Sequence, residues 1–265
     1  DGTLGALAGG GDLALASAVA GGLVVNAVIA TNGAASTLTK LGPGSATLAA
    51  PNTFSGVTAI GGGTLLLTHA DALQNSTLGG AGVEFDASVP GHAFAVGGLT
   101  GSFPLALEDN GGNPVNLTRG RGNSSASYSG VLSGPGGLTK TGTATQTLSG
   151  VNTFSGGVTV SQGALSVGNA SSLGTGPVVN DATLNLTAGG VTYSGLSSSL
   201  SGTGTVNVTL TTGSGTTYLH GDYSGFTGIW NLGIGAAANA AKAYMNGADN
   251  SAATINVLSN AALYC

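Results

Sequence analysis

The sequence predicts an all-β protein in which one chain coils into a β-solenoid, a stack of short parallel strands joined by tight turns. Three observations predict this fold. The 265 residues include 50 glycines, 6% of the residues are charged and 5% are aromatic. Short runs of residues alternate between apolar and polar, and one long motif occurs twice. Such a composition suits thin sheets better than a thick central core.

Disorder does not fit this composition. Hydrophobic residues make up 41% of the chain, and the charge density is too low to keep a chain with that apolar content solvated and unfolded. We therefore expect the chain to fold, mostly as β-structure.

The first long apolar stretch is LALASAVAGGLVVNAVIA at residues 13–30. It has the length of a transmembrane helix. An internal relative argues against a span, because LAGGGDLAL at 7–15 aligns with LTGSFPLAL at 99–107 and that copy continues into the charged segment EDNGGNPVNLTRGRG. A position that accepts charges in one copy is not built for lipid in the other, so we predict no membrane span.

Two long copies of one motif organise the chain. LTKLGPGSATLAAPNTFSG occupies residues 38–56, and LTKTGTATQTLSGVNTFSG occupies residues 138–156. A weaker copy begins at LSGTGTVNV, where YSGFTG later stands in for NTFSG. We predict a single continuous domain over residues 1–265, with internal repeats of about 100 residues and no linker. The approximate passes are 1–98, 99–199 and a partial pass over 200–265.

Both copies continue into paired alternating runs. In the second copy Val158 and Val160 alternate with polar residues, and after a glycine Leu165 and Val167 do the same. A period of two predicts strands with one buried face. Strands this short cannot bury that face alone, so we expect successive coils to stack, with glycine at corners that need positive φ.

A coil of about 20 to 25 residues would make roughly a dozen rungs, and at about 4.8 Å per rung a rod of about 50 to 60 Å. A sandwich or barrel is the competing all-β fold. The long internal repeat and the glycine content favour the solenoid.

Equivalent positions of the two copies are expected to be structural. Lys40 and Lys140 precede a turn, and we expect each to be a solvated corner residue; a ligand-binding lysine is the alternative. Asn52 and Asn152 can bond to the backbone or stack in a ladder. The aromatic and glycine positions of the motif, which we expect to pack in the core or at corners, are Phe54, Phe154, Phe226, Gly56 and Gly156.

The segment LTKTGTATQTLSGVNTFSGGVTVSQGALSVG at 138–168 closely resembles the autotransporter-associated β-strand repeat. GVLSGPGGLTKTG at 130–142 and GDYSGFTGIW at 221–230 are similar to the same family. Such repeats occur in the passenger regions of type V secreted proteins and in other large bacterial surface proteins. The resemblance implies a right-handed parallel β-helix displayed outside a bacterial cell. We therefore expect a passenger fragment, a processed passenger or a stand-alone surface or fibre protein. The sequence starts at Asp1 without Met and without the basic region of a signal peptide, so we expect that any signal peptide has already been removed.

Charge and cysteine content limit the classes of partner that the chain can bind. Five basic residues and a net charge of −5 leave little to neutralise a phosphate backbone, so we predict no nucleic-acid binding and no anionic membrane surface as partner. No cofactor motif is present, and none is expected. The single cysteine, Cys265, cannot form an intrachain disulfide; it is a fragment end, an anchor or a possible intermolecular link.

An enzyme remains the weakest alternative. Glu84 and Asp86, in VEFDA, are spaced for a carboxylate pair on one side of a strand, with His92 nearby. We interpret them as a solvated strand face, and His220 with Asp222 as a corner pair that lacks a nucleophile. GGAGVEFDA at 79–87 departs from the calcium nonapeptide and has no tandem copy, so no metal site is expected.

The sequence therefore favours a non-enzymatic bacterial surface protein, a passenger-like solenoid acting as an adhesive or structural stalk. The second hypothesis is a self-assembling fibre or sheath subunit that stacks end to end, because low charge leaves the open ends of a solenoid without repulsion. The third is a glycan-active β-helix enzyme. Expected partners are further copies of the chain, or glycans or proteins of a host or cell surface.

Overall fold

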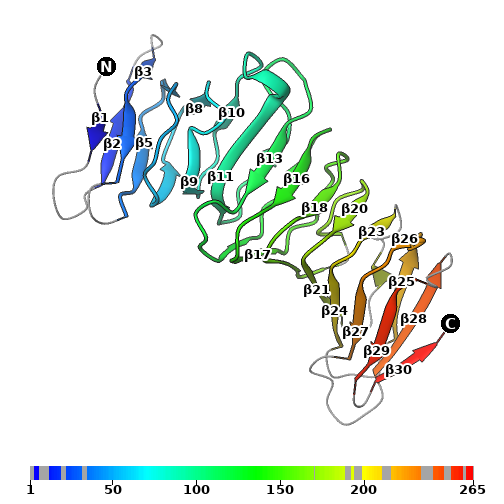
Figure 1. The fold of residues 1–265 in the computed structure, drawn as a ribbon. Coiled ribbons are helices and arrows are strands. Elements are labelled where there is room, and N and C mark those ends of the chain that lie inside the picture. The colour runs from blue at the N-terminus through cyan, green and yellow to red at the C-terminus, as the bar shows by residue number, and fades with distance from the viewer. Residues whose placement is uncertain are drawn as a thin grey trace.

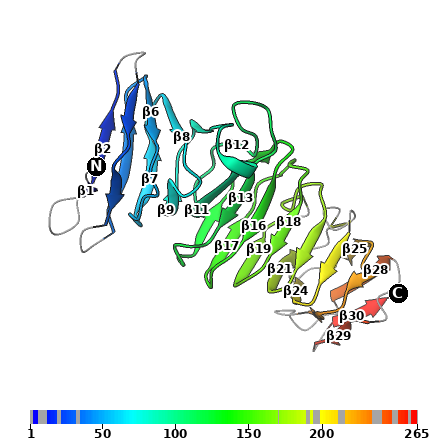
Figure 2. The ribbon, with the colours of Figure 1, turned by 45° about the horizontal axis from the view of Figure 1, so that its top comes forward.

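The protein is an elongated β-solenoid in the computed structural model, with its two ends far apart (Figures 1 and 2). The structure describes residues 3–5, 12–18, 22–31, 35–169, 171–188, 192–193, 199–210, 216–233, 241–247, 252–258 and 261–264. Every strand-to-strand pairing between named strands in these ranges is parallel, and no α-helix occurs there. This confirms the fold class predicted from the sequence.

Two sheets run along most of the rod. The long sheet has eleven strands among the described residues, in the order β2 (Leu13–Ala16), β5 (Leu38–Leu41), β7 (Val57–Ile60), β9 (Leu73–Leu78), β11 (Ala93–Leu99), β13 (Asn116–Arg119), β16 (Gly137–Lys140), β18 (Val158–Val160), β20 (Val178–Asn180), β23 (Leu200–Gly202) and β26 (Gly225–Phe226). The seven-stranded sheet, counted over the same residues, contains β14 (Ala126–Tyr128), β17 (Thr145–Leu148), β19 (Ala164–Val167), β21 (Thr183–Ala188), β24 (Thr205–Leu210), β27 (Ile229–Leu232) and β29 (Thr254–Val257).

Shorter sheets complete the coils. The N-terminal four-stranded sheet holds β3 (Leu23–Val25), β6 (Ser45–Leu48), β8 (Thr64–Leu67) and β10 (Val83–Phe85), and the C-terminal one holds β22 (Thr192–Tyr193), β25 (Thr216–Gly221), β28 (Ala241–Gly247) and β30 (Ala261–Tyr264). Two pairs remain in the described part of the chain: β1 (Thr3–Gly5) with β4 (Val28–Ala30), and β12 (Leu105–Ala106) with β15 (Leu132–Ser133). The 3₁₀ turn η1 (Pro90–His92) precedes β11.

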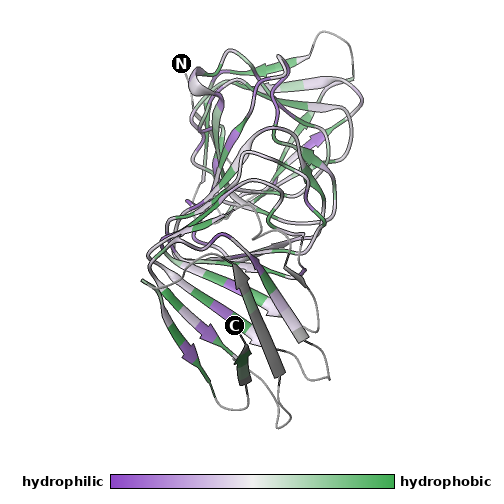
Figure 3. Cartoon of the chain, turned by 90° about the vertical axis from the view of Figure 1, so that its right-hand side faces the viewer, coloured by the Kyte–Doolittle hydropathy of each residue, from purple (hydrophilic) through white to green (hydrophobic). Residues whose placement is uncertain are grey.

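Alternation along the strands builds the interior. In β17 and β19 every second side chain is buried, and the register places Leu148 beside Val167 and Leu186 in successive rungs. Figure 3 shows the same alternation of apolar and hydrophilic residues along neighbouring strands. The buried positions join into one narrow core that runs the length of the rod. Each rung therefore relies on its neighbours for burial, as in other solenoids.

The solenoid changes its pairing midway along the rod, at β11. This strand pairs with β9 at Val96, Gly98 and Leu99, whereas its pairing with β13 on the other side covers residues 93–96 and does not continue to Gly98 and Leu99. The backbone of Leu99 is completed by a side chain: its N–H donates to Gln146 Oε1 at 3.2 Å, and its carbonyl accepts from Gln146 Nε2 at 3.0 Å. The same Nε2 also lies 3.1 Å from Ala126 O. The side chain of Gln146 thus makes the two hydrogen bonds that a neighbouring strand would make to Leu99, at the point that we call the fork of β11.

Buried asparagines join three successive rungs at one corner. Asn152 Oδ1 accepts from Leu132 N at 2.8 Å, and Asn152 Nδ2 donates to Ser172 O at 2.6 Å. Asn52 makes the equivalent pair of bonds to Ile29 N and Ala72 O. Both side chains are almost wholly buried. The side-chain amide thus pairs with one backbone N–H and one backbone C=O at the corner, where strand pairing does not satisfy them.

The lysine corners differ from the sequence expectation. Lys40 and Lys140 are buried, with 0% and 1% of their surface exposed, not solvated. Lys40 Nζ donates to the carbonyls of Leu41, Gly42 and Gly62 at 2.9 to 3.0 Å. Lys140 repeats this arrangement with residues 141, 142 and 162 at 2.5 to 3.1 Å. The ammonium turns inward because three carbonyls converge there, and three N–H donors satisfy them together.

The aromatic positions of the motif lie in the core. Phe54, Phe154 and Phe226 are each at most 1% exposed, and Phe226 packs edge-on against Trp230. Gly156 is required by close approach, since a Cβ there would lie 2.5 Å from backbone atoms of Gly136; Gly56 is in an equivalent position. The glycine two residues after each lysine has positive φ, +79° and +66°. Glycine therefore serves both turns and tight stacking.

Replacing Asn152 by aspartate tests the corner clamp. Asn152→Asp keeps the acceptor for Leu132 N but sets a carboxylate oxygen against Ser172 O, so a buried donor is lost. We expect the free energy of unfolding at pH 7 to fall by about 2–3 kcal/mol, measured by guanidinium denaturation. Asn75→Asp, at a half-buried position with only a 3.5 Å contact to Thr53 O, should change it by under about 0.5 kcal/mol. Equal effects at the two sites would contradict the clamp.

Replacing Gln146 by alanine tests the side-chain bridge, and alanine is what the first copy carries at the matching position, Ala46. Gln146→Ala leaves both backbone groups of Leu99 without a partner. We expect a loss of about 2–4 kcal/mol and faster hydrogen exchange of the Leu99 amide. The exposed Gln162→Ala is the control. Unchanged exchange at Leu99 would show that Gln146 does not complete this ladder.

Candidate functional site

The outward face of the seven-stranded sheet carries two columns of uncharged side chains, which we call the hydroxyl–amide face. Strand register places the first column at Ser125, Thr145, Ala164, Thr183, Thr205, Ile229 and Thr254, and the second at Ser127, Thr147, Ser166, Asn185, Asn207, Asn231 and Asn256. The columns contain no charged residue. With about 4.8 Å between rungs, they form an array about 29 Å long. The array is polar except at Ala164 and Ile229 of the first column.

Hydrogen bonds order the second column. Asn256, Asn231 and Asn207 each donate from Nδ2 to the Oδ1 of the asparagine in the preceding rung, at 2.9 Å in each case. Asn185 continues the chain to Ser166 Oγ at 3.1 Å. Each amide keeps a second N–H and a further carbonyl lone pair. The face therefore presents fixed donors and acceptors rather than freely rotating side chains.

A groove of about 410 Å³ lies at the N-terminal end of this face. Its lining residues are Val57, Thr77, Thr100, Ser125, Ala126, Ser127, Thr145 and Thr147. They come from β7, β9, the residue after β11, and the first two rungs of the hydroxyl–amide face. The groove thus lies where the ladder forks at β11. Six of the eight lining side chains carry a hydroxyl, and none is charged.

Two cations lie side by side inside the solenoid. Arg119 and Lys140 are register partners on β13 and β16, and Arg119 is 1% exposed. Arg119 Nη2 donates to Ser124 O at 2.8 Å and Thr145 O at 3.3 Å, whereas its Nε and Nη1 have no protein partner. Burial lowers the pKa of Arg119 to about 10. Burial and the Arg119 charge lower the pKa of Lys140 to about 8.

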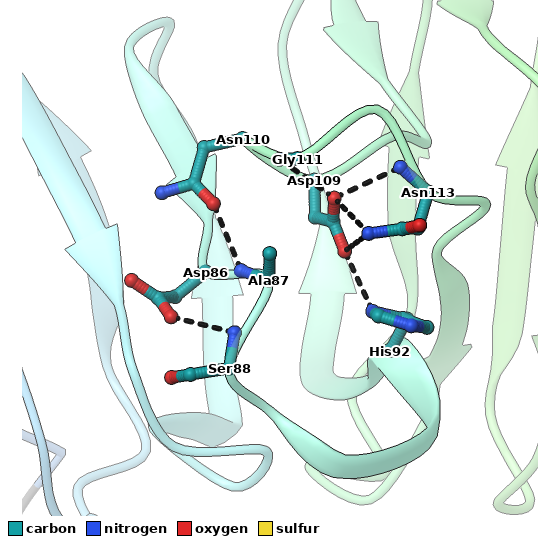
Figure 4. Close-up of polar contacts among 8 residues, drawn as sticks. All are labelled: Asp86, Ala87, Ser88, His92, Asp109, Asn110, Gly111 and Asn113. Atoms are coloured by element: carbon teal, nitrogen blue, oxygen red, sulfur yellow. Dashed lines mark hydrogen bonds and ion pairs between the residues drawn. The ribbon is translucent and has the colours of Figure 1, made fainter.

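The loop after β12 is held by one carboxylate (Figure 4). Asp109 Oδ1 accepts from the backbone N–H groups of Gly111 and Asn113 at 2.9 Å, and Asp109 Oδ2 lies 2.6 Å from His92 Nδ1. Burial alone would raise the pKa of Asp109, but these hydrogen bonds and His92 hold it below its ordinary value. The pair fastens the η1 turn to the loop and leaves Asp109 no free lone pair directed at a substrate.

The carboxylates considered for catalysis are not brought together around a reactive centre. Glu84 is exposed on β10, whereas Asp86 lies beyond the end of that strand and accepts from Ser88 N at 2.8 Å. His92 pairs with Asp109 instead. Asp222 accepts from Ser224 N and Oγ. His220 stacks on Tyr218, at 5.7 Å between ring centroids. These partners organise turns and strand faces.

Two further findings apply only to the described residues. They contain no group of three His, Cys, Asp or Glu side chains arranged to hold a metal. They also contain no helix long and apolar enough to cross a bilayer. Cys265 lies outside the described residues.

Sequence reasoning did not locate the residues of the two features that make this site. The residues of the hydroxyl–amide face could have been located from the alternation of side chains along each strand. Thr145 and Thr147 flank a buried residue, and so do Thr183 and Asn185. The groove had no local signal, since its walls are separated by up to ninety residues along the chain. Arg119 lies two residues after the buried Leu117, on the same face of the strand, but its burial was not predicted.

Comparison with known proteins identifies the repeat. The family model named Passenger-associated-transport-repeat matches residues 38–67 and 138–167. These two segments are copies of a passenger-associated repeat. Each matched passenger repeat covers four strands, β5 to β8 and β16 to β19, together with the buried lysine and asparagine. This confirms the family inferred from residues 138–168.

A curated relative extends the likeness beyond the passenger repeats. Over 140 residues the chain is 32% identical to the Adhesin BmaC autotransporter of Brucella suis biovar 1 (strain 1330). The match covers 51% of the chain and 4% of that protein. No solved structure shows a significant match. Fold and repeats together make the chain passenger-like.

The stability of the chain should rise with pH between about 8 and 9.5. The pKa of Lys140 is about 8 in the folded state and 10.5 as the reference value, so the unfolded chain binds more protons over this interval and folding becomes more favourable as pH rises. Burial raises the pKa values of Tyr128 and Tyr223, which opposes the trend only above about pH 10.

Denaturation midpoints from pH 7 to 9.5 measure this rise. Lys140→Met should flatten it. Lys40→Met is the matched control: it removes the same three-carbonyl contact but keeps Arg119 beside Lys140, and it should retain the rise. A slope unchanged in Lys140→Met would show that the buried ammonium is not its origin.

Proposed function

We propose that the chain is a non-enzymatic segment of a bacterial surface passenger, a rigid stalk whose hydroxyl–amide face provides an adhesive surface. The observation that carries the proposal is this ordered uncharged face on a solenoid that contains two passenger-associated repeats. An asparagine ladder fixes side chains that would otherwise lose conformational entropy on binding. The relative's designation as an adhesin supports the same role.

The scaffold is suited to carry such a face away from a cell. Parallel ladders continue from β2 to β29, and one core runs beneath them, so load along the rod is shared by many backbone hydrogen bonds. Weak contacts repeated at each rung add up through multivalency. An extracellular location at the bacterial surface follows from this proposal.

Beads coated with the purified chain test the adhesive role. We expect them to adhere to cultured animal cells several-fold more than beads coated with serum albumin, because the face is presented in many copies. The double variant Asn207→Asp with Asn231→Asp places charges in the asparagine ladder and should lower adherence to the level of the albumin beads. The exposed Ser129→Asp with Ser149→Asp, directly after β14 and β17, adds the same charge outside the ladder and should keep most of the extra adherence. Equal adherence of wild-type and albumin beads would refute the role.

Electron microscopy over a concentration series separates a stalk from a fibre subunit. The proposed stalk predicts isolated short rods at all concentrations. Filaments that lengthen with concentration would instead support end-to-end assembly, and would replace the stalk by a self-assembling fibre.

A further inference from the structure

We propose that the groove at the fork of β11 binds a neutral oligosaccharide through its hydroxyl groups. The proposal rests on the adhesive role proposed above and deepens it, since the groove opens onto the hydroxyl–amide face. Its volume, about 410 Å³, lies within the range of about 300–1,000 Å³ usual for small-ligand sites.

The chemistry of the lining selects the class of ligand. Thr77, Thr100, Ser125, Ser127, Thr145 and Thr147 supply hydroxyls that can each donate and accept. A charged ligand would lose water without meeting an opposite charge. A wholly apolar ligand would cover these hydroxyls and leave them without partners. A ligand that itself carries many neutral hydroxyls satisfies both conditions.

A peptide strand is disfavoured because the nearby backbone is already paired. Both backbone groups of Leu99 bond to Gln146, and Ser127 O accepts from Gly101 N. Gly101 O in turn accepts from Ser129 N at 2.8 Å. Strand addition requires a free row of N–H and C=O groups. The groove offers side-chain hydroxyls instead, which is the mode of contact that a saccharide can use.

The shape of the groove depends on a missing side chain. A Cβ at Gly98 would lie 3.1 Å from Thr77 Oγ1 and 3.4 Å from Ala126 Cβ, both on lining residues. Gly98 does not have positive φ, so alanine fits its backbone. Val57, 39% exposed, adds an apolar wall against which the C–H face of a sugar ring can pack. Thr145 and Thr147 belong to both groove and face, so a longer chain can continue along the rungs.

Titration of the whole 265-residue chain with defined hexasaccharides tests the proposal. The probes are the neutral hexamers of α-1,4-glucose, β-1,4-glucose, β-1,4-mannose and β-1,4-N-acetylglucosamine, with hexagalacturonate as the anionic comparison. We expect at least one neutral hexamer to bind, detected by calorimetry or ligand-observed NMR, and hexagalacturonate to bind at least tenfold more weakly than that hexamer.

Two groove variants should weaken the binding by about tenfold or more. Thr147→Val removes one hydroxyl at nearly constant shape, and Gly98→Ala narrows the groove while keeping every hydroxyl. Thr64→Val, a hydroxyl on β8 outside the lining, is the matched control and should bind as the wild type does. Denaturation midpoints confirm that each variant is folded.

Three results would overturn the proposal: no neutral hexamer binds, hexagalacturonate binds as tightly as the best neutral hexamer, or both groove variants bind normally. Bead adherence is a separate measurement. Adherence without sugar binding would remove the groove as a saccharide site and leave the adhesive role. Sugar binding without adherence would leave the groove as a saccharide site and remove the adhesive role.

Discussion

The structure depends on how the backbone is satisfied where the coils turn. Parallel ladders pair the strands, but the corners leave N–H and C=O groups inside a narrow core that excludes water, and unpaired groups there are costly. Asn152 supplies one donor and one acceptor, Lys140 supplies three donors, and Gln146 replaces a strand. Each residue type matches the number of groups left open. The same corner solution recurs in the first copy, at Asn52 and Lys40.

Much of this fold could be predicted from the sequence, because period-two alternation, glycine and the repeated motif are local and additive signals. The lysine corners were predicted wrongly for a physical reason. A lysine before a glycine turn suggests a solvated ammonium. Lys40 is two residues after the buried Leu38, however, and alternate residues of a strand point to the same face. Burial then follows from three converging carbonyls, which no single-residue preference describes.

The candidate site was harder to predict because it depends on register and not on composition. The partners in the asparagine ladder are separated by 22, 24 and 25 residues, since turns of different length separate the rungs. The groove requires a strand whose neighbour on one side, β13, ends part-way along its length, and this long-range arrangement is stabilised by the bonds of Gln146 to the backbone of Leu99. Only the assembled solenoid brings Thr77 beside Ala126.

The internal cations also determine the character of the surface. Of the five Lys and Arg residues, Lys40, Arg119 and Lys140 are buried, and Arg121 pairs with Asp71 at 2.9 Å. Exposed acidic residues remain at turns and edges: Asp12, Glu84, Glu108, Asp181 and Asp222. The outside is therefore more acidic than the formal charge of −5 suggests, while the hydroxyl–amide face is neutral. Negative charge at the edges repels anions, whereas the neutral face can form hydrogen bonds without that repulsion.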